Sequence, residues 1–311
     1  MANGRTQREK VSAPRVKESL RRQIGDASRT LRAPALDDEG VHRARKALKR
    51  ARANLRLLRP LVGERAYARE NAALRDAARP LGAIRDARVI VETLEGILER
   101  EKNASRRALL VKLRALLDEA RTSAWAEIQA SGTPAKSAAA LDKAWRRVER
   151  RRVPRKGASR LGEGLERIYR RGRSALADVR ADCTPETLHE WRKHVKYLGH
   201  ALDSLGGDAR RRPAKIVKRL ERLADALGDD HDLVVLEHEV LRRHARSNAR
   251  AGLITAIAAR RKALQSKALK AGRVLFKPKP RAFARGVQAA FREAHRESRK
   301  ETVTRAHQAS G

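Results

Sequence analysis

The chain carries two short phrases twice, in the same order and at nearly the same offset. The first phrase returns 147 positions later: Val41-His42-x-x-Arg45-Lys46-x-Leu48-Lys49 becomes Leu188-His189-x-x-Arg192-Lys193-x-Val195-Lys196. The second returns 146 positions later: Leu81-Gly82-x-x-Arg85-Asp86 becomes Leu227-Gly228-x-x-His231-Asp232. Repetition at a fixed offset is typical of duplicated structural units. The chain is therefore predicted to fold as two similar modules, each with one basic helix face.

Composition indicates a helical protein with a polyanionic partner. The 311 residues include 74 Lys and Arg against 37 Asp and Glu, and only 3% are aromatic. The dominant residue types favour helix over sheet, and an apolar fraction of 41% is enough for packed cores. A net charge of +37 opposes folding by self-repulsion. It predicts binding to nucleic acid, an anionic membrane surface or a phosphate polymer.

Turn residues divide the chain into an arm, two modules, a connector and an extension. Residues 1–14 are predicted to be a disordered basic arm, and 132–158 a connector. Residues 15–131 and 159–275 are predicted to form tandem antiparallel four-helix bundles, followed by a basic, helical extension at 276–311. Asp37 and Asp38 offer caps for the second helix. The predicted helices span 14–31, 40–59 (ending at Pro60), 64 onward with a kink or break at Gly82, 103–130, 159–181, 185–205, 213–245 with a break at Gly228, 248–274 and 282–305.

Both copies of the first phrase separate apolar and basic residues around a helix. At about 100° per residue, the apolar residues fall in one arc and the basic residues in another. Like charges four residues apart weaken a helix, so a ligand explains the stripe better than stability does. The alternative is a solvated cationic face. The apolar arcs are Val41, Ala44, Leu48, Ala51, Leu55 and Leu58, and Leu188, Trp191, Val195, Leu198, Leu202 and Leu205.

The residue types in the stripe suit phosphate. Arginine can hold phosphate oxygens bidentately, lysine supplies a mobile point charge, and histidine gains charge as pH falls. From His42 to Arg56 the stripe is about 21 Å long at 1.5 Å per residue. That length favours a polymer over a single small anion.

The phrases resemble the CHAD family, the conserved-histidine α-helical domain proteins, over about residues 10–275. The resemblance implies two four-helix bundles related by an internal pseudo-two-fold axis. It also implies that the basic helices face one another across a channel or groove that binds inorganic polyphosphate, at polyphosphate granules. Arg21, on the first predicted helix, joins the candidate set. The candidate polyphosphate-binding residues are Arg21, His42, Arg45, Lys46, Lys49, Arg52, Arg85, His189, Arg192, Lys193, Lys196 and His231.

The two copies also differ. Gly199 and Asp203 stand where the first copy has Arg52 and Arg56, so one wall is expected to be less basic at its C-terminal end. The repeated carboxylates are expected to orient a phosphate-binding residue or to support a helix start. The residues assigned such supporting or structural roles are Asp86, Asp232, Gly82 and Gly228.

Two other functions stay open. Charge alone is compatible with a nucleoid-type protein that binds DNA without sequence preference. A metal-dependent polyphosphate hydrolase is less favoured, because Asp229-Asp230-His231-Asp232 could hold a divalent ion but Ala83-Ile84-Arg85-Asp86 could not. The chain is therefore predicted to be a binding protein, with no catalytic residues, cofactor or metal.

Cellular context is inferred from cysteine usage and hydropathy. Cys183 is the single cysteine, so an intrachain disulfide is impossible and a reducing compartment is expected. The sequence shows neither a secretion signal nor an apolar run long enough for a membrane span. A cytoplasmic location at polyphosphate granules is predicted. The oligomeric state and the number of bound phosphates stay open.

Overall fold

The computed structural model describes residues 12–154, 158–206, 214–243, 247–291 and 293, excluding the side chains of 83–87, 158, 206, 214 and 215. Within these residues every regular element is a helix, which confirms the predicted all-α class. Most of the predicted arm lies outside the described residues. The predicted C-terminal helix is described over 280–291. Among the described residues, no helix combines the length and hydropathy needed to cross a bilayer.

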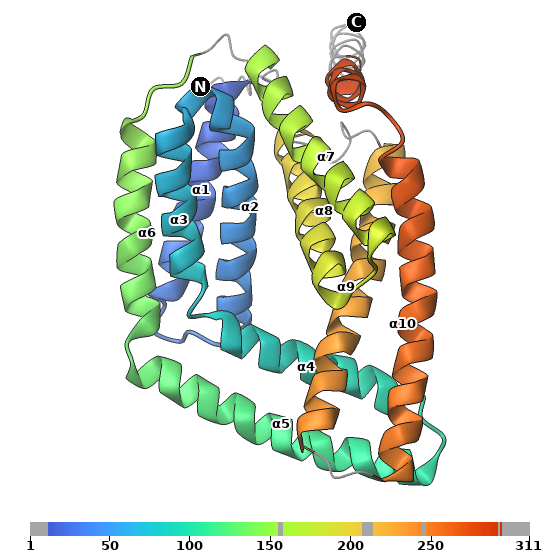
Figure 1. Cartoon of the computed structure of the whole chain (residues 1–311). Coiled ribbons are helices and arrows are strands. Elements are labelled where there is room, and N and C mark those ends of the chain that lie inside the picture. Colours follow the sequence, from blue (N-terminus) through green and yellow to red (C-terminus); the bar gives the residue numbers. More distant parts are fainter. Residues whose placement is uncertain (1–11, 155–157, 207–213, 244–246, 292, 294–311) are drawn as a thin grey trace, which may run out of the picture.

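The labelled helices follow the predicted order closely (Figure 1). The Asp37 carboxylate accepts from the Gly40 backbone N–H at 2.7 Å and caps α2, as predicted. Helix α2 runs through Pro60 and ends before Gly63, whose φ is +82°, so the predicted end at Pro60 is two residues early. The labelled helices are α1 (Ala13–Leu31), α2 (Asp38–Val62), α3 (Glu64–Ala78), α4 (Gly82–Leu98), α5 (Ala104–Ala130), α6 (Thr133–Arg150), α7 (Ala158–Ala181), α8 (Pro185–Gly206), α9 (Ala214–Arg243) and α10 (Asn248–Leu275).

The two Leu-Gly phrases adopt different local structures. In the first half α3 ends at Ala78 and α4 begins at Gly82, which confirms a break there. In the second half α9 continues through Gly228, so the predicted break at that glycine is wrong. The difference follows from Pro80, which lacks an N–H and clashes with the carbonyl four residues earlier. The second copy has Ala226 at the equivalent position, so nothing interrupts the helix.

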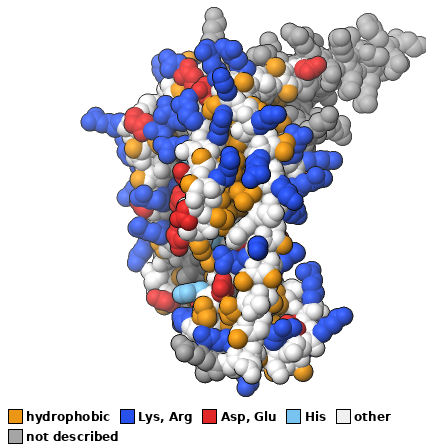
Figure 2. Space-filling view, turned by 45° about the vertical axis from the view of Figure 1, so that its right-hand side comes forward, with side chains coloured by type: hydrophobic (Ala, Val, Ile, Leu, Met, Phe, Trp, Pro, Cys, Tyr) orange, Lys and Arg blue, Asp and Glu red, His pale blue; other side chains and the backbone are white. Residues whose placement is uncertain are grey.

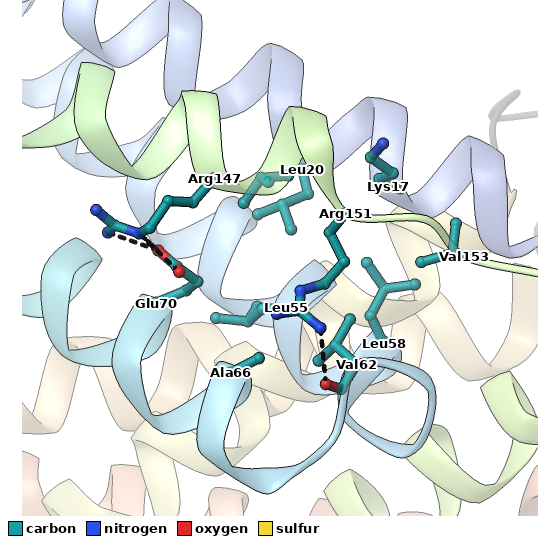
Figure 3. Close-up of a pocket in the computed structure, with 11 residues that line it drawn as sticks. Lys17, Leu20, Leu55, Leu58, Val62, Ala66, Glu70, Arg147, Arg151 and Val153 are labelled. Carbon is teal, nitrogen blue, oxygen red and sulfur yellow. Dashed lines mark hydrogen bonds and ion pairs between the residues drawn. The ribbon is translucent and has the colours of Figure 1, made fainter.

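Helix α6 occupies most of the segment that was predicted to be a connector. It starts after Gly132, which has φ of +63°, and packs against α1 and α3. Arg147 donates to both carboxylate oxygens of Glu70 at 2.7–3.1 Å, and the Glu70 side chain is only 5% exposed (Figure 3). Arg151 reaches the Val62 carbonyl at 3.4 Å. These contacts fix α6 to the first half of the molecule.

The helices form two upright groups joined by two crossing helices (Figure 1). Helices α1, α2, α3 and α6 lie on the left of the view, and α7 to α10 on the right. Helices α4 and α5 run across the lower edge, where α4 contacts α9 and α5 contacts α10. The first upright group is therefore not built from four consecutive helices, because α6 takes the place that α4 and α5 were expected to fill. The pseudo-two-fold relation stays a prediction.

The core confirms the apolar arcs of both basic helices. Every residue of the two predicted arcs is buried, including Trp191, which has no exposed surface. Helix α2 lies in the middle of the molecule and contacts α1, α3, α7 and α8. Its backbone approaches α7 closely at Gly164, where an added Cβ would lie 2.3 Å from the Leu57 carbonyl oxygen. Only glycine permits this approach, which holds α7 of the second half against α2.

Candidate functional site

A cavity of about 320 Å³ between α2, α8 and α9 collects basic side chains from both halves of the chain. We call it the central cavity. Surface charge alone would not locate it, because Lys and Arg side chains are spread over the visible face (Figure 2). Apolar residues of α8 and α9, among them Val195 and Leu220, complete the lining. Its charged and histidine lining residues are His42, Arg45, Lys46, Lys49, Lys196, His200, Asp203 and Glu221.

The first basic phrase contributes four residues to this cavity. The buried arc of α2 faces the core, so the opposite arc carries His42, Arg45, Lys46 and Lys49 into the space beside α8. Arg45 donates from Nη1 to the Ala78 carbonyl at 2.8 Å, where α3 ends. The same Nη1 lies 3.6 Å from the position that a Cβ on Gly82 would occupy. The two repeated phrases of the first half therefore meet at Arg45.

Of the basic residues in the second copy of this phrase, Lys196 lines the cavity, beside the apolar Val195. His189 lies against His231 of the second Leu-Gly phrase, with 3.4 Å between their Nδ1 atoms. Arg192 is buried and lies 3.9 Å from an Asp232 carboxylate oxygen. Lys193 is paired with Glu190 at 2.6 Å on the exposed side of α8. The two phrases of the second half therefore also meet, through His189 with His231 and Arg192 with Asp232.

The remaining candidates lie elsewhere or outside the described side chains. Arg21 pairs with Glu18 and Glu149 and lies over the Trp145 ring, so it belongs to the contact between α1 and α6. Arg52 donates to the Asn71 side chain at 3.1 Å and is not among the residues that line the central cavity. The side chains of Arg85 and Asp86 lie outside the described set.

His200 is a lining residue that the sequence comparison missed. The first copy has Ala53 at the equivalent position, so the repeat gave no signal. The spacing within α8 does give a signal, because His200 lies four positions after Lys196 and therefore falls on the same side of the helix. Asp203 also lines the cavity, in agreement with the expectation that one wall is less basic. Glu221 adds a second carboxylate from α9.

Burial among cations keeps both cavity histidines neutral near pH 7. Burial lowers the pKa of His42; Glu39 opposes this shift, and Arg88, Lys49 and Lys46 add to it. Burial lowers the pKa of His200 to about 4, helped by cations that include Arg50 and Lys196. Neutral imidazoles can donate one hydrogen bond each to an anion without adding charge repulsion to the empty site.

The acidic run of α9 does not converge on one point. Asp230 is buried and accepts from Gln265 at 3.0 Å, with Arg261 at 3.4 Å. His231 turns toward His189 and Asp232 toward Arg192. Across the described part of the chain, no group of three or more His, Cys, Asp or Glu residues is arranged to hold a metal ion.

Comparison with known proteins agrees with the motifs. A family model described as the CHAD domain matches residues 16–242, so the chain belongs to the CHAD family. A search of curated proteins finds no significant match. PptA from Streptomyces chartreusis is similar, with a TM-score of 0.58 and 17% identity over 92% of this chain and 99% of that one. The CHAD domain from the plant Ricinus communis is also similar, with a TM-score of 0.54 and 18% identity over 86% of this chain and 93% of that one. At these identities the likeness shows the fold alone.

Proposed function

We propose that the protein binds inorganic polyphosphate in the central cavity. One observation carries the proposal: basic residues from both copies of the basic phrase line a single cavity, although the copies are 147 residues apart in the chain. The CHAD family is associated with polyphosphate, which is consistent with this ligand. By the same reasoning, we place the protein in the cytoplasm at polyphosphate granules.

The lining suits a flexible phosphate chain. Lys46, Lys49 and Lys196 supply mobile point charges from two helices, while Arg45 is held in place by the Ala78 carbonyl. Held arginine and mobile lysine together can follow successive phosphates without demanding one geometry. Each cation that displaces counterions adds affinity, so binding should weaken steeply with salt.

Titration of the purified protein with long-chain polyphosphate tests the proposal. The combined change Lys46→Gln, Lys49→Gln and Lys196→Gln removes three cations without touching a buried side chain. Because a hydrogen bond to a charged group contributes about 1.5–3 kcal/mol, affinity should fall about 100-fold or more. The matched control changes Lys112, Lys143 and Lys262 to Gln, which are exposed and lie outside the cavity. Equal losses in the two variants would contradict the assigned site.

Competition separates polyphosphate binding from general attraction to polyanions. Duplex DNA at the same phosphate concentration should displace polyphosphate poorly, because a rigid duplex does not enter a cavity of about 320 Å³. Efficient displacement would favour a nucleoid-type DNA-binding protein. Phosphate release with added Mg²⁺ or Mn²⁺ is expected to stay at the level of a protein-free control. Release above that level would favour the hydrolase.

A further inference from the structure

A second basic pocket lies farther along α2, and none of its lining residues belongs to the candidate set. It has a volume of about 280 Å³ and lies between α2, α3, α7 and α8. We call it the Arg–Tyr pocket. Its charged and aromatic lining residues, apart from His194, are Arg56, Arg59, Tyr67, Arg167, Arg171 and Tyr197.

Two stacked pairs shape this pocket. The Arg56 guanidinium lies 3.7 Å from the centre of the Tyr197 ring, and Arg59 lies 4.4 Å from the Tyr67 ring. Arg56 also donates to the Arg52 carbonyl at 2.9 Å. The close approach of α7 to α2 at Gly164 brings Arg167 and Arg171 to the same opening. The guanidinium groups are therefore positioned before any ligand arrives.

The pocket holds more positive charge than its surroundings balance. Arg59 pairs with Glu64 at 2.7 Å. In the described part of the chain, no carboxylate forms an ion pair with Arg56, Arg167 or Arg171, and none lines the pocket. Burial lowers the pKa of Arg56, with Arg52 and Arg171 acting in the same direction. A partly buried cation without a counter-charge is costly, and a bound anion would remove that cost.

We propose that the Arg–Tyr pocket is a second phosphate-binding site and that one polyphosphate chain occupies it together with the central cavity. This inference rests on the proposed function. Both sites use α2 and α8, and Lys49 and Arg56 are about 10 Å apart along α2 at 1.5 Å per residue. Arg52 lies between them on α2, with its guanidinium 5.8 Å from the Tyr197 ring. A chain that spans both sites gains effective concentration for the second contact, whereas a short chain fills one site at a time.

Chain length and two matched variants test this arrangement by titration calorimetry. The test variant is Arg167→Gln with Arg171→Gln, two exposed positions on α7 that leave the core intact. The control is Arg170→Gln with Arg180→Gln, which removes the same charge from the same helix but lines neither site. Long-chain polyphosphate should bind the test variant about tenfold or more weakly than the control, because linked sites gain at least that factor. Tripolyphosphate should bind the wild type at two sites and the test variant at one.

The outcomes separate this inference from the proposed function. If the test and control variants bind long chains equally and tripolyphosphate occupies one site in all proteins, the second site is overturned. The proposed function would then stand on the lysine variants of the central cavity. If tripolyphosphate fills two sites but long chains lose no more affinity in the test variant than in the control, the claim that one chain spans both sites is overturned. If the wild type binds no polyphosphate of any length, the proposed function fails.

Discussion

The two copies of the basic phrase have similar sequences but different surroundings. In the first copy, four residues line the central cavity, and Arg45 among them donates to the Ala78 carbonyl. In the second copy, Lys196 lines the cavity, whereas His189, Arg192 and Lys193 contact His231, Asp232 and Glu190. The duplicated pattern therefore preserves which face of the helix is basic. The neighbouring elements decide which of those side chains line the central cavity.

The difference can be traced to the second phrase of each half. In the first half Pro80 ends α3, and α4 leads away toward the second upright group. In the second half α9 passes straight through the equivalent position. His231 and Asp232 are thereby carried past His189 and Arg192 on a continuous helix, close enough to pair with them. Pro80 thus separates α3 from α4 in the first half, whereas α9 stays continuous in the second half.

The largest expected effect is a difference in polyphosphate affinity between the two copies. Lys46→Gln with Lys49→Gln should weaken binding of long-chain polyphosphate about 30-fold or more, because two charge-assisted contacts are lost. His189→Gln with Lys193→Gln alters the equivalent phrase outside the cavity and should change affinity less than about threefold. Titrations at one salt concentration provide the measurement. Equal losses would mean that both phrases bind the ligand in the same way.

The next effect concerns stability. Arg192→Leu should lower the free energy of unfolding by about 2–3 kcal/mol, because Asp232 would lose a buried cationic neighbour. Lys193→Gln removes only an exposed pair and should change it by less than about 1 kcal/mol. Urea denaturation followed by circular dichroism measures both. If Arg192→Leu left the free energy of unfolding unchanged but weakened polyphosphate binding, Arg192 would be a ligand-binding residue and not a structural one.

His200 should make stability depend on pH. Its pKa falls from 6.5 to about 4 in the folded protein, so the unfolded chain binds this proton more readily. The folded protein keeps this imidazole neutral, and the stability of the fold that depends on the neutral imidazole is fully present above pH 6.5 and is lost as pH falls toward 4. Between pH 7 and 5 the wild type should lose at most about 2 kcal/mol more than His200→Gln. If the free energy of unfolding changed with pH in the same way in the wild type and in His200→Gln, this histidine would not be buried as described.

The smallest effect separates His42 from His189 by the pH dependence of binding. Burial lowers the pKa of His42 in the empty site. A phosphate bound beside His42 would raise that pKa, so the protein would take up protons when it binds polyphosphate. Affinity for polyphosphate should then rise about threefold between pH 8 and 6, less than the tenfold per pH unit that one full proton would give. His42→Gln should abolish the rise and His189→Gln should keep it. A flat wild-type profile would place both histidines in structural roles.

Helix periodicity and capping predicted most of the fold. The apolar arcs of α2 and α8 are buried as expected, and Asp37 caps α2. Gly228 was misjudged because a glycine inside a long helix carries no stop signal without a neighbouring proline. Helix α6 was missed because the turn signals at Gly132 and Pro134 mark a helix start as well as a helix end.

The candidate site was predictable only in part, because a helix face does not specify its partner. His42, Arg45, Lys46, Lys49 and Lys196 meet in one cavity, as the repeat suggested. Whether a cation faces a ligand or a carboxylate depends on which distant element packs against it. For Arg192 that element is α9, and for Arg21 it is α6. Such contacts join residues far apart in the chain and leave no local pattern in the sequence.

Protection of individual lysines from acylation tests the central claim most directly. The protein is labelled with and without long-chain polyphosphate at about ten times its Kd, and each lysine is quantified by mass spectrometry. Lys46, Lys49 and Lys196 should then react about tenfold more slowly when the ligand is present. Lys193 and the exposed Lys112, Lys143 and Lys262 should keep their reactivity. Uniform protection of all lysines, or protection of Lys193 without Lys49, would contradict a site in the central cavity.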